Sequence, residues 1–259
     1  MQAIVLATWL AAGPGLAPAM AIEAAATETS LTPSVPSDVV RTYGNACAPC
    51  HGGDGRGNGP AAFSIAPGRA PRPRDFTAGR YKLRSTPSGH VPTDADLMRT
   101  IRRGIPRYMP AFGDLDEATV LGLVQYVKGK SPRFGGASPV PIEIPRPPSP
   151  AAGDTAPAAA ERGAKLYGEL GCVACHGERG RGNGTAAAAL KDMSGDRIWP
   201  ADLAHPSWFK GGSSREDVYR TLMTGMDGTP MPGYHDVFAG LPPRAPWDLI
   251  VYVESLSRE

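Results

Sequence analysis

The sequence has little of what most soluble domains use to build a core or a regular sheet. Only 7% of its 259 residues are aromatic, whereas it contains 32 glycines and 28 prolines. This composition disfavours long helices and strands, and it predicts short helices joined by long ordered loops. No apolar run reaches the about 20 residues that a membrane-spanning helix needs. A formal net charge of +2 gives no reason to expect binding to nucleic acid.

Cysteine is scarce as well, and its four copies form two pairs with the same spacing. The pairs lie in Cys47–His51 and Cys172–His176, and both segments read Cys-x-x-Cys-His. Two cysteines at this spacing can both reach one haem, and the histidine after them turns toward the iron, so the motif is the signature of c-type haem attachment. One zinc site made of all four cysteines, or disulfide bonds within or between the pairs, are the alternatives. The separation of 125 residues and the histidine after each pair argue against zinc.

Other landmarks repeat in the same order after each motif. The glycine-rich segment Gly55–Gly59 returns as Gly180–Gly184. A hydroxyl residue three positions before an acid, which is a helix start signal, occurs at Thr93 and again at Ser214. A glycine that would end the helix follows each of them, then a Met-Pro pair, then an apolar stretch with helical periodicity; the two glycines are Gly104 and Gly225.

The repeat divides the chain into two tandem domains, residues 37–130 and 161–259. Both are expected to be all-α and loop-rich, and each is expected to wrap around a covalently attached haem that supplies the missing core. Residues 131–160, rich in Pro and Ala, should form a semi-rigid linker, and residues 22–36 a disordered leader.

Residues 1–21 have the apolar stretch and small-residue cleavage pattern of a signal peptide. They predict cleavage near Ala21 and export to the periplasm, although the segment has no Lys or Arg before its apolar stretch. A short uncleaved anchor is the alternative.

The sixth ligand of each iron has to come from another part of the chain. Met109 and Met231 hold the same place in the two halves, and the proline after each stiffens its loop, so they are the predicted distal ligands. His235, four residues after Met231, is the rival. The unrepeated methionines are expected to fill the core, and the unrepeated histidines to lie at the surface or in packing positions: Met98, Met193, Met223, Met226, His90 and His205.

With its Cys-x-x-Cys-His motifs and downstream Met-Pro pairs, each half resembles a bacterial class I cytochrome c domain, and the whole resembles a periplasmic di-haem cytochrome c. The resemblance implies that the N- and C-terminal helices of each half cross near the haem. It also implies that a proline carbonyl accepts the ring proton of the proximal histidine. Pro60 is the candidate in the first half, but Thr185 stands at the aligned position in the second. The tyrosines expected at the crossings are Tyr43, Tyr126, Tyr167 and Tyr252.

Iron bound by protein on both faces leaves no open position for a substrate, which predicts single-electron transfer between redox proteins rather than catalysis. The expected partners are a redox donor and an acceptor, with a membrane or dehydrogenase complex among the candidates, and no transmembrane segment is expected in the mature chain. The alternatives are a peroxidase-like or thiosulfate-oxidising di-haem enzyme and a relay subunit of a larger respiratory or dehydrogenase complex. The predicted residues for two haem c groups are Cys47, Cys50, His51, Cys172, Cys175 and His176, with His51, Met109, His176 and Met231 as iron ligands.

Arginines raise two further hypotheses. The net charge is +6 over residues 37–130 and −2 over residues 161–259, so the basic half is a candidate docking surface for an acidic redox partner. The arginines that precede Met109 either dock this partner or form a solvated helix face: Arg99, Arg102, Arg103 and Arg107. Four residues near the glycine-rich loops and the repeated Pro-x-Asp segments either reach haem propionates or face solvent: Arg56, Arg181, Arg74 and Trp199.

Overall fold

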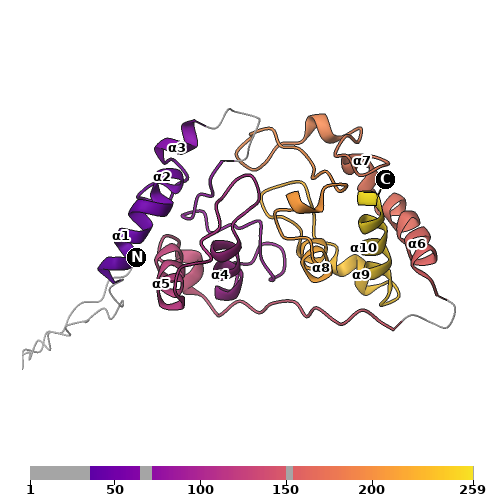
Figure 1. The fold of residues 1–259 in the computed structure, drawn as a ribbon, viewed down its shortest axis with the longest axis horizontal. Coiled ribbons are helices and arrows are strands. Elements are labelled where there is room, and N and C mark those ends of the chain that lie inside the picture. Colours follow the sequence, from indigo (N-terminus) through magenta and orange to yellow (C-terminus); the bar gives the residue numbers. More distant parts are fainter. Residues whose placement is uncertain (1–35, 65–71, 150–153, 259) are drawn as a thin grey trace, which may run out of the picture. The chain divides into compact units, whose positions relative to one another are not determined.

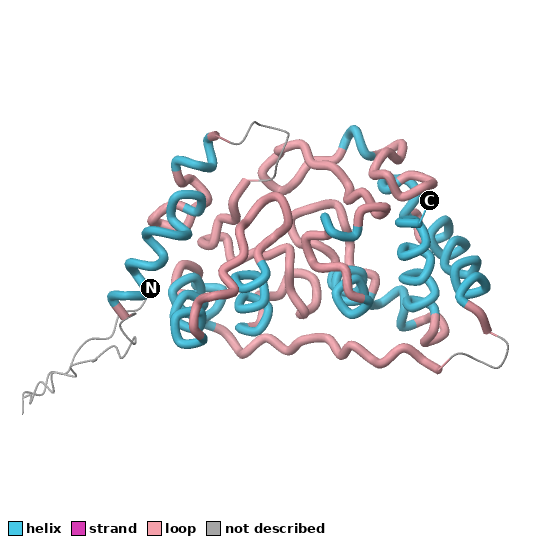
Figure 2. Tube along the Cα trace, viewed as in Figure 1, coloured by secondary structure: helices cyan, strands magenta, loops and turns pink. Residues whose placement is uncertain are grey.

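A computed structural model describes residues 36–64, 72–149 and 154–258 of the chain. The predicted signal peptide lies outside the described residues, as does the leader except for Pro36. The described residues belong to one compact unit, and Figure 2 shows helices joined by long loops. In these ranges the only β-pairing is two isolated bridges, Ile105–Met109 and Lys191–Arg197. The prediction of an all-α, loop-rich fold is confirmed, and within the described part of the chain no helix is long and apolar enough to cross a bilayer.

In the first half the helices are short, as the composition predicts (Figure 1). A π-helical turn, Tyr43–Cys47, joins the first two into one helical segment that ends with the Cys-x-x-Cys-His motif. Such turns occur often at functional sites. The α-helices are α1 (Ser37–Thr42), α2 (Ala48–His51), α3 (Pro60–Phe63), α4 (Asp94–Arg103) and α5 (Glu117–Lys128).

The predicted boundaries of α4 are confirmed. The Thr93 side chain accepts a hydrogen bond from the backbone N–H of Asp96, and the Asp96 carboxylate accepts one from the N–H of Thr93. This reciprocal cap satisfies two of the N–H groups that a helix start leaves free. The helix ends at Gly104, whose φ of 69° and ψ of −168° lie in a region that essentially only glycine occupies.

The second half repeats this order with a different entry to its motif. Gly171, with a φ of 75°, separates the first helix from the motif helix, where the first half has its π-turn. The first helix begins at Ala156, capped by Thr155, which is five residues before the predicted start of the domain. The α-helices are α6 (Ala156–Glu169), α7 (Cys172–His176), α8 (Arg215–Thr224), α9 (His235–Ala239) and α10 (Ala245–Ser255).

The terminal helices of each half cross closely, as expected. A Cβ on Gly122 of α5 would come within 2.5 Å of the Val39 side chain on α1, and a Cβ on Gly163 of α6 would collide with the Asp248 carbonyl of α10. Predicted tyrosine pairs mark both crossings. Ring centroids lie 4.6 Å apart for Tyr43–Tyr126 and 5.2 Å apart for Tyr167–Tyr252.

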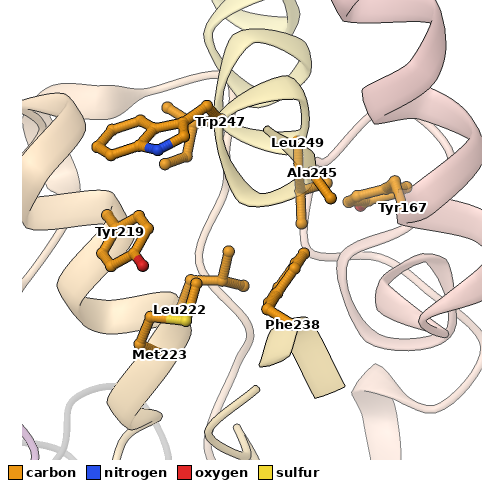
Figure 3. Close-up of a cluster of buried hydrophobic side chains, with 9 residues drawn as sticks. Tyr167, Tyr219, Leu222, Met223, Phe238, Ala245, Trp247 and Leu249 are labelled. Atoms are coloured by element: carbon orange, nitrogen blue, oxygen red, sulfur yellow. The ribbon is translucent and has the colours of Figure 1, made fainter. Parts of the chain in front are cut away.

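One hydrophobic cluster lies in each half. The first joins α1, α4, α5 and the loop before α4; its buried members are Val39, Tyr43, Phe76, Tyr81, Leu97, Leu123, Val124 and Val127. In Figure 3 the second cluster gathers side chains from α6, α8, α9 and α10. Cys47 and Cys172 pack against the edges of these clusters, so each attachment motif borders a core.

The segment between the halves is extended and packs along both of them. The backbone N–H of Ile142 donates to the Ser85 carbonyl of the first half at 2.7 Å, while the side chains of Ile142 and Ile144 pack against the core of the second. Phe134, at the start of the segment, meets Tyr81 edge-on.

Candidate haem sites

The two histidines of the motifs are held in the same way. The Nδ1 atom of His51 lies 3.1 Å from the Arg74 carbonyl oxygen, and Nδ1 of His176 lies 3.0 Å from the Ala201 carbonyl oxygen. Because a carbonyl only accepts, Nδ1 must carry the proton in both rings, and Nε2 is left with the lone pair that binds a metal.

The expectation that Pro60 accepts this proton is wrong. The acceptors Arg74 and Ala201 are the middle residues of the repeated Pro-x-Asp segments, which pass beside the histidine rings. The glycine-rich loop before Pro60 folds back onto the motif's own backbone instead, with the Gly59 N–H donating to the Cys50 carbonyl. The absence of a proline at Thr185 therefore leaves His176 with its acceptor, since both halves use the same Pro-x-Asp position.

The glycine-rich loop is built by the same contacts in both halves. The N–H groups of Gly57 and Gly182 donate to the carbonyls of His51 and His176, both at 2.8 Å. Both glycines have a φ of +72°, and a Cβ on either would press into the carbonyl of the proline in the Pro-x-Asp segment. The loop therefore fixes the end of the motif helix and brings the proton acceptor to the histidine.

A tyrosine closes the other side of each motif. The hydroxyl of Tyr43 donates to the Gly52 carbonyl at 2.8 Å, and that of Tyr167 donates to the Gly177 carbonyl at 2.7 Å. Burial raises the pKa of both phenols above the usual value, so they remain protonated donors.

Both motif histidines are partly buried. The Phe76 ring stacks on His51 with centroids 4.4 Å apart. Burial lowers the pKa of both His51 and His176, and the hydrogen bond to the backbone carbonyl opposes this only in part. The neutral imidazole, which is the form that binds metal, is favoured in both.

The two Met-Pro segments also share one backbone arrangement. The Ile105 N–H donates to the Met109 carbonyl at 2.9 Å, and the Met226 N–H donates to the Met231 carbonyl at 3.0 Å. Each loop turns tightly against the glycine that ends the preceding helix. A Cβ on Gly104 would lie 2.5 Å from the Met109 carbonyl oxygen. Both methionines are partly buried.

In the second half, one contact ties the Met231 loop to the attachment motif. The Tyr234 hydroxyl donates to the Leu170 carbonyl at 3.3 Å. Burial, followed by the nearby Cys172, raises the pKa of Tyr234 to about 12. The loop that carries Met231 thus lies against the end of the helix that leads to the cysteines.

The chemistry of the donor set fits a haem in each half. All four cysteines are free, and within the described ranges no three His, Cys, Asp or Glu side chains gather as a metal site, so the structure does not support the four-cysteine zinc alternative. The buried Tyr81 hydroxyl has no hydrogen-bond partner in the structure. It lies in the ring stack that starts at His51, where a bound group with acceptor oxygens would satisfy it.

Comparison with known proteins agrees with these sites. Residues 35–127 match the family model of cytochrome c oxidase, cbb3-type, subunit III, and residues 160–257 match that of cytochrome c. A chain of the reducing HAO-like protein complex of Kuenenia stuttgartiensis is 37% identical, with a TM-score of 0.76 over 86% of this chain and 96% of that one. No curated protein sequence matches. The chain is a di-haem c-type cytochrome.

This cytochrome carries two covalently bound haem c groups, and its pairs Cys47/Cys50 and Cys172/Cys175 fit the attachment motif. The rival ligand His235 is exposed and pairs with Asp236. His90 is exposed, and His205 pairs with Asp202 while stacking on Trp208.

Of the other methionines, Met223 is buried in the second core and Met98 packs against the first, as expected. Met193 was expected in the core, but it is 49% exposed.

Most of the arginines expected at a docking surface have partners within the chain. Arg99 pairs with Asp96, Arg102 donates to the Leu115 carbonyl, and Arg103 pairs with Asp217 of the second half. Arg107 is exposed and lies over the Trp208 ring.

The propionate candidates in the glycine-rich loops face solvent, since Arg181 is exposed and Arg56 is exposed beside Asp54. Trp199 is exposed as well, whereas Arg74 is partly buried.

Proposed function

We propose that this cytochrome passes single electrons between redox proteins, with His51 and Met109 as the iron ligands of the first haem and His176 and Met231 as those of the second. The observation that carries this proposal is the repetition of two backbone devices. In each half a carbonyl orients the motif histidine, and a closed loop presents a methionine between a helix end and proline. Cys47 and Cys50, and likewise Cys172 and Cys175, would form the thioether bonds to the two haems.

The surroundings of these residues suit electron transfer. Haem iron supplies one-electron redox chemistry, and a His/Met ligand pair raises its reduction potential. The chain contributes rigidity: the Nδ1 hydrogen bonds fix the histidine rings, and the loops of Met109 and Met231 are closed by their own backbone. A site held in this way changes little between oxidation states, which favours fast electron exchange.

The ligand assignment is tested by optical and magnetic circular dichroism spectroscopy of the purified holoprotein. Met109→Ala and Met231→Ala should each remove the far-red thioether-to-iron band of one haem and lower one of two reduction potentials in a redox titration. Met226→Leu is the matched control, because Met226 lies in the same loop as Met231, and it should leave both haems unchanged. A thioether band of undiminished intensity in either alanine variant would disprove that ligand.

A relay role inside a larger assembly is the second candidate, and it is favoured by the similarity to a chain of a protein complex. Co-purification of the tagged cytochrome with a stable partner would support the relay role, and purification as a lone monomer with full electron exchange would support the free carrier. A di-haem enzyme would instead need an exchangeable ligand. Binding of carbon monoxide to one reduced haem of the native protein would favour it.

Export to the periplasm completes the proposal. N-terminal sequencing of the holoprotein should find a mature chain that starts near Ile22. A chain that retains Met1 and remains with the membrane would instead support the uncleaved anchor.

A further inference from the structure

A buried arginine of the first half reaches the second half. Arg84 lies in the loop before α4, and its side chain is completely buried. Within the first half its Nη1 and Nε atoms donate to the carbonyls of Tyr81 and Pro87, both at 3.3 Å. Burying a guanidinium is unfavourable unless an anion and further acceptors compensate for the lost water. The anion comes from a point more than 100 residues further along the chain.

The compensating groups belong to the segment that carries Met231. The Nη2 atom of Arg84 donates to the Thr224 carbonyl at 2.5 Å and lies 2.9 Å from Oδ1 of Asp227. Two further donors of the first half complete the contact, since the Ser88 hydroxyl and the Gly89 N–H bind the Asp227 carboxylate at 2.8 and 2.9 Å. The first half therefore holds this segment at two points, the end of α8 and Asp227.

The loop beyond Asp227 is linked to Met231 by its own hydrogen bonds. The Thr229 hydroxyl donates to the Met226 carbonyl at 2.7 Å and accepts from the Met231 N–H at 3.2 Å, and the Met226 N–H donates to the Met231 carbonyl. Asp227 directly follows Met226, so a displacement of Asp227 is transmitted to Met231 through Met226 by two routes: one direct hydrogen bond, and two hydrogen bonds by way of the Thr229 hydroxyl.

The Met109 loop meets the other half differently. Arg107 lies 4.4 Å from the centroid of the Trp208 ring, and Lys210 of the second half lies 4.6 Å from that of Tyr108. These contacts join partly exposed side chains, and they do not hold the loop backbone through a buried charge.

We propose that Arg84 is a positioning residue for Met231: from the first half, it fixes through Thr224 and Asp227 the loop that presents the distal ligand of the second haem. The inference rests on the proposed role of Met231. Dissociation of a thioether requires its loop to open, and the population of the open state rises as the contacts that hold the loop closed are removed. Arg84 thus keeps the second iron closed to outside ligands.

The experiment measures imidazole binding to the oxidised holoprotein by stopped-flow spectroscopy, with each haem assigned through the Met109→Ala and Met231→Ala variants. In Arg84→Met and in Asp227→Asn, imidazole should bind the second haem at least about tenfold faster, because the loop opens more often. A tenfold rise in the open population corresponds to about 1.4 kcal/mol. The second reduction potential should fall, and the first haem should behave as in the wild type. Arg84→Lys, which keeps the positive charge, should bind imidazole at a rate between those of the wild type and Arg84→Met.

Arg103→Met is the matched control. Arg103 also joins the two halves, but its hydrogen bonds go to Asp217 and the Gly211 carbonyl, which lie outside the loop from Met226 to Met231. Unchanged imidazole rates in Arg84→Met and Asp227→Asn, or an equal acceleration in Arg103→Met, would overturn the proposal. Failure of the proposed ligand role would be seen separately, because Met231→Ala itself would then leave the spectrum unchanged.

Discussion

Gly104→Ala should release Met109, and its cost can be worked out from the structure. The backbone at Gly104 lies in a region that costs an L-residue about 1–3 kcal/mol. An added Cβ would also lie 2.5 Å from the Met109 carbonyl oxygen and 2.6 Å from the carbonyl carbon of Pro110. Relief of such overpacking typically costs a further ~1–3 kcal/mol in backbone displacement. We expect a total loss of about 2–6 kcal/mol, which lowers the Tm by roughly 4–24 °C for a chain of this size.

The assay combines thermal denaturation of the holoprotein with the far-red thioether band. Because the displaced carbonyl belongs to Met109 itself, Gly104→Ala should weaken the band of the first haem as well as the stability, and Gly225→Ala should do the same for the second. Gly195→Ala is the control, since Gly195 also has a positive φ but an added Cβ would meet nothing within 4 Å. If Gly104→Ala lowered the Tm no more than Gly195→Ala and kept its thioether band, the glycine would not be needed to position the methionine.

Four further predictions concern the same frame. Gly163→Ala should destabilise the protein by more than ~2 kcal/mol in chemical denaturation because its Cβ collides with α10, whereas Gly168→Ala on the same helix, with open space, should be neutral or stabilising by up to ~1 kcal/mol. Asp248→Asn should cost about 2–4 kcal/mol because the buried carboxylate binds Arg162 and Arg244, and Glu254→Gln, in an exposed pair with Arg215, should cost less than ~1 kcal/mol. Tyr43→Phe should cost about 1–2 kcal/mol, as the Gly52 carbonyl loses its donor, and a Tm equal to that of the wild type would contradict this. The first haem should have the higher potential, because positive charges gather near its histidine. The Arg74 carbonyl holds His51, and the charge of Arg74, after burial, is the next cause that lowers the pKa of Lys82 and of Lys210. A redox titration with the haems assigned through Met231→Ala checks the order.

Much of this frame follows from local sequence signals. Thr93 and Ser214 each cap a helix, Gly104 and Gly225 each end one, and the tyrosine pairs lie at the helix crossings. These features depend on residues close in sequence or on an apolar pattern, so the chain itself encodes them.

The acceptor of the histidine proton was missed although a signal for it existed. Pro73 and Pro200 begin repeated Pro-x-Asp segments, but a backbone carbonyl leaves no trace in the identity of its residue: Arg74 and Ala201 do the same work with unlike side chains. The partners of Arg84 in the second half had no signal at all. They lie about 140 residues away and occur once, so neither periodicity nor repetition reveals them.

The starts of α4 and α8 show how such distant contacts change a local outcome. At α4 the Asp96 carboxylate returns a hydrogen bond to the Thr93 N–H and completes the cap. At α8 the Ser214 hydroxyl accepts from the Asp217 N–H, but the Asp217 carboxylate pairs with Arg220 and with Arg103 of the other half. An ion pair that is largely shielded from water outweighs one capping hydrogen bond, so the same sequence signal gives a full cap in one half and a bridge between the halves in the other. Differences between the two haems are therefore expected where the repeat is broken, at Arg84, at Arg103 and at the charges around Arg74, rather than in the ligand loops that both halves share.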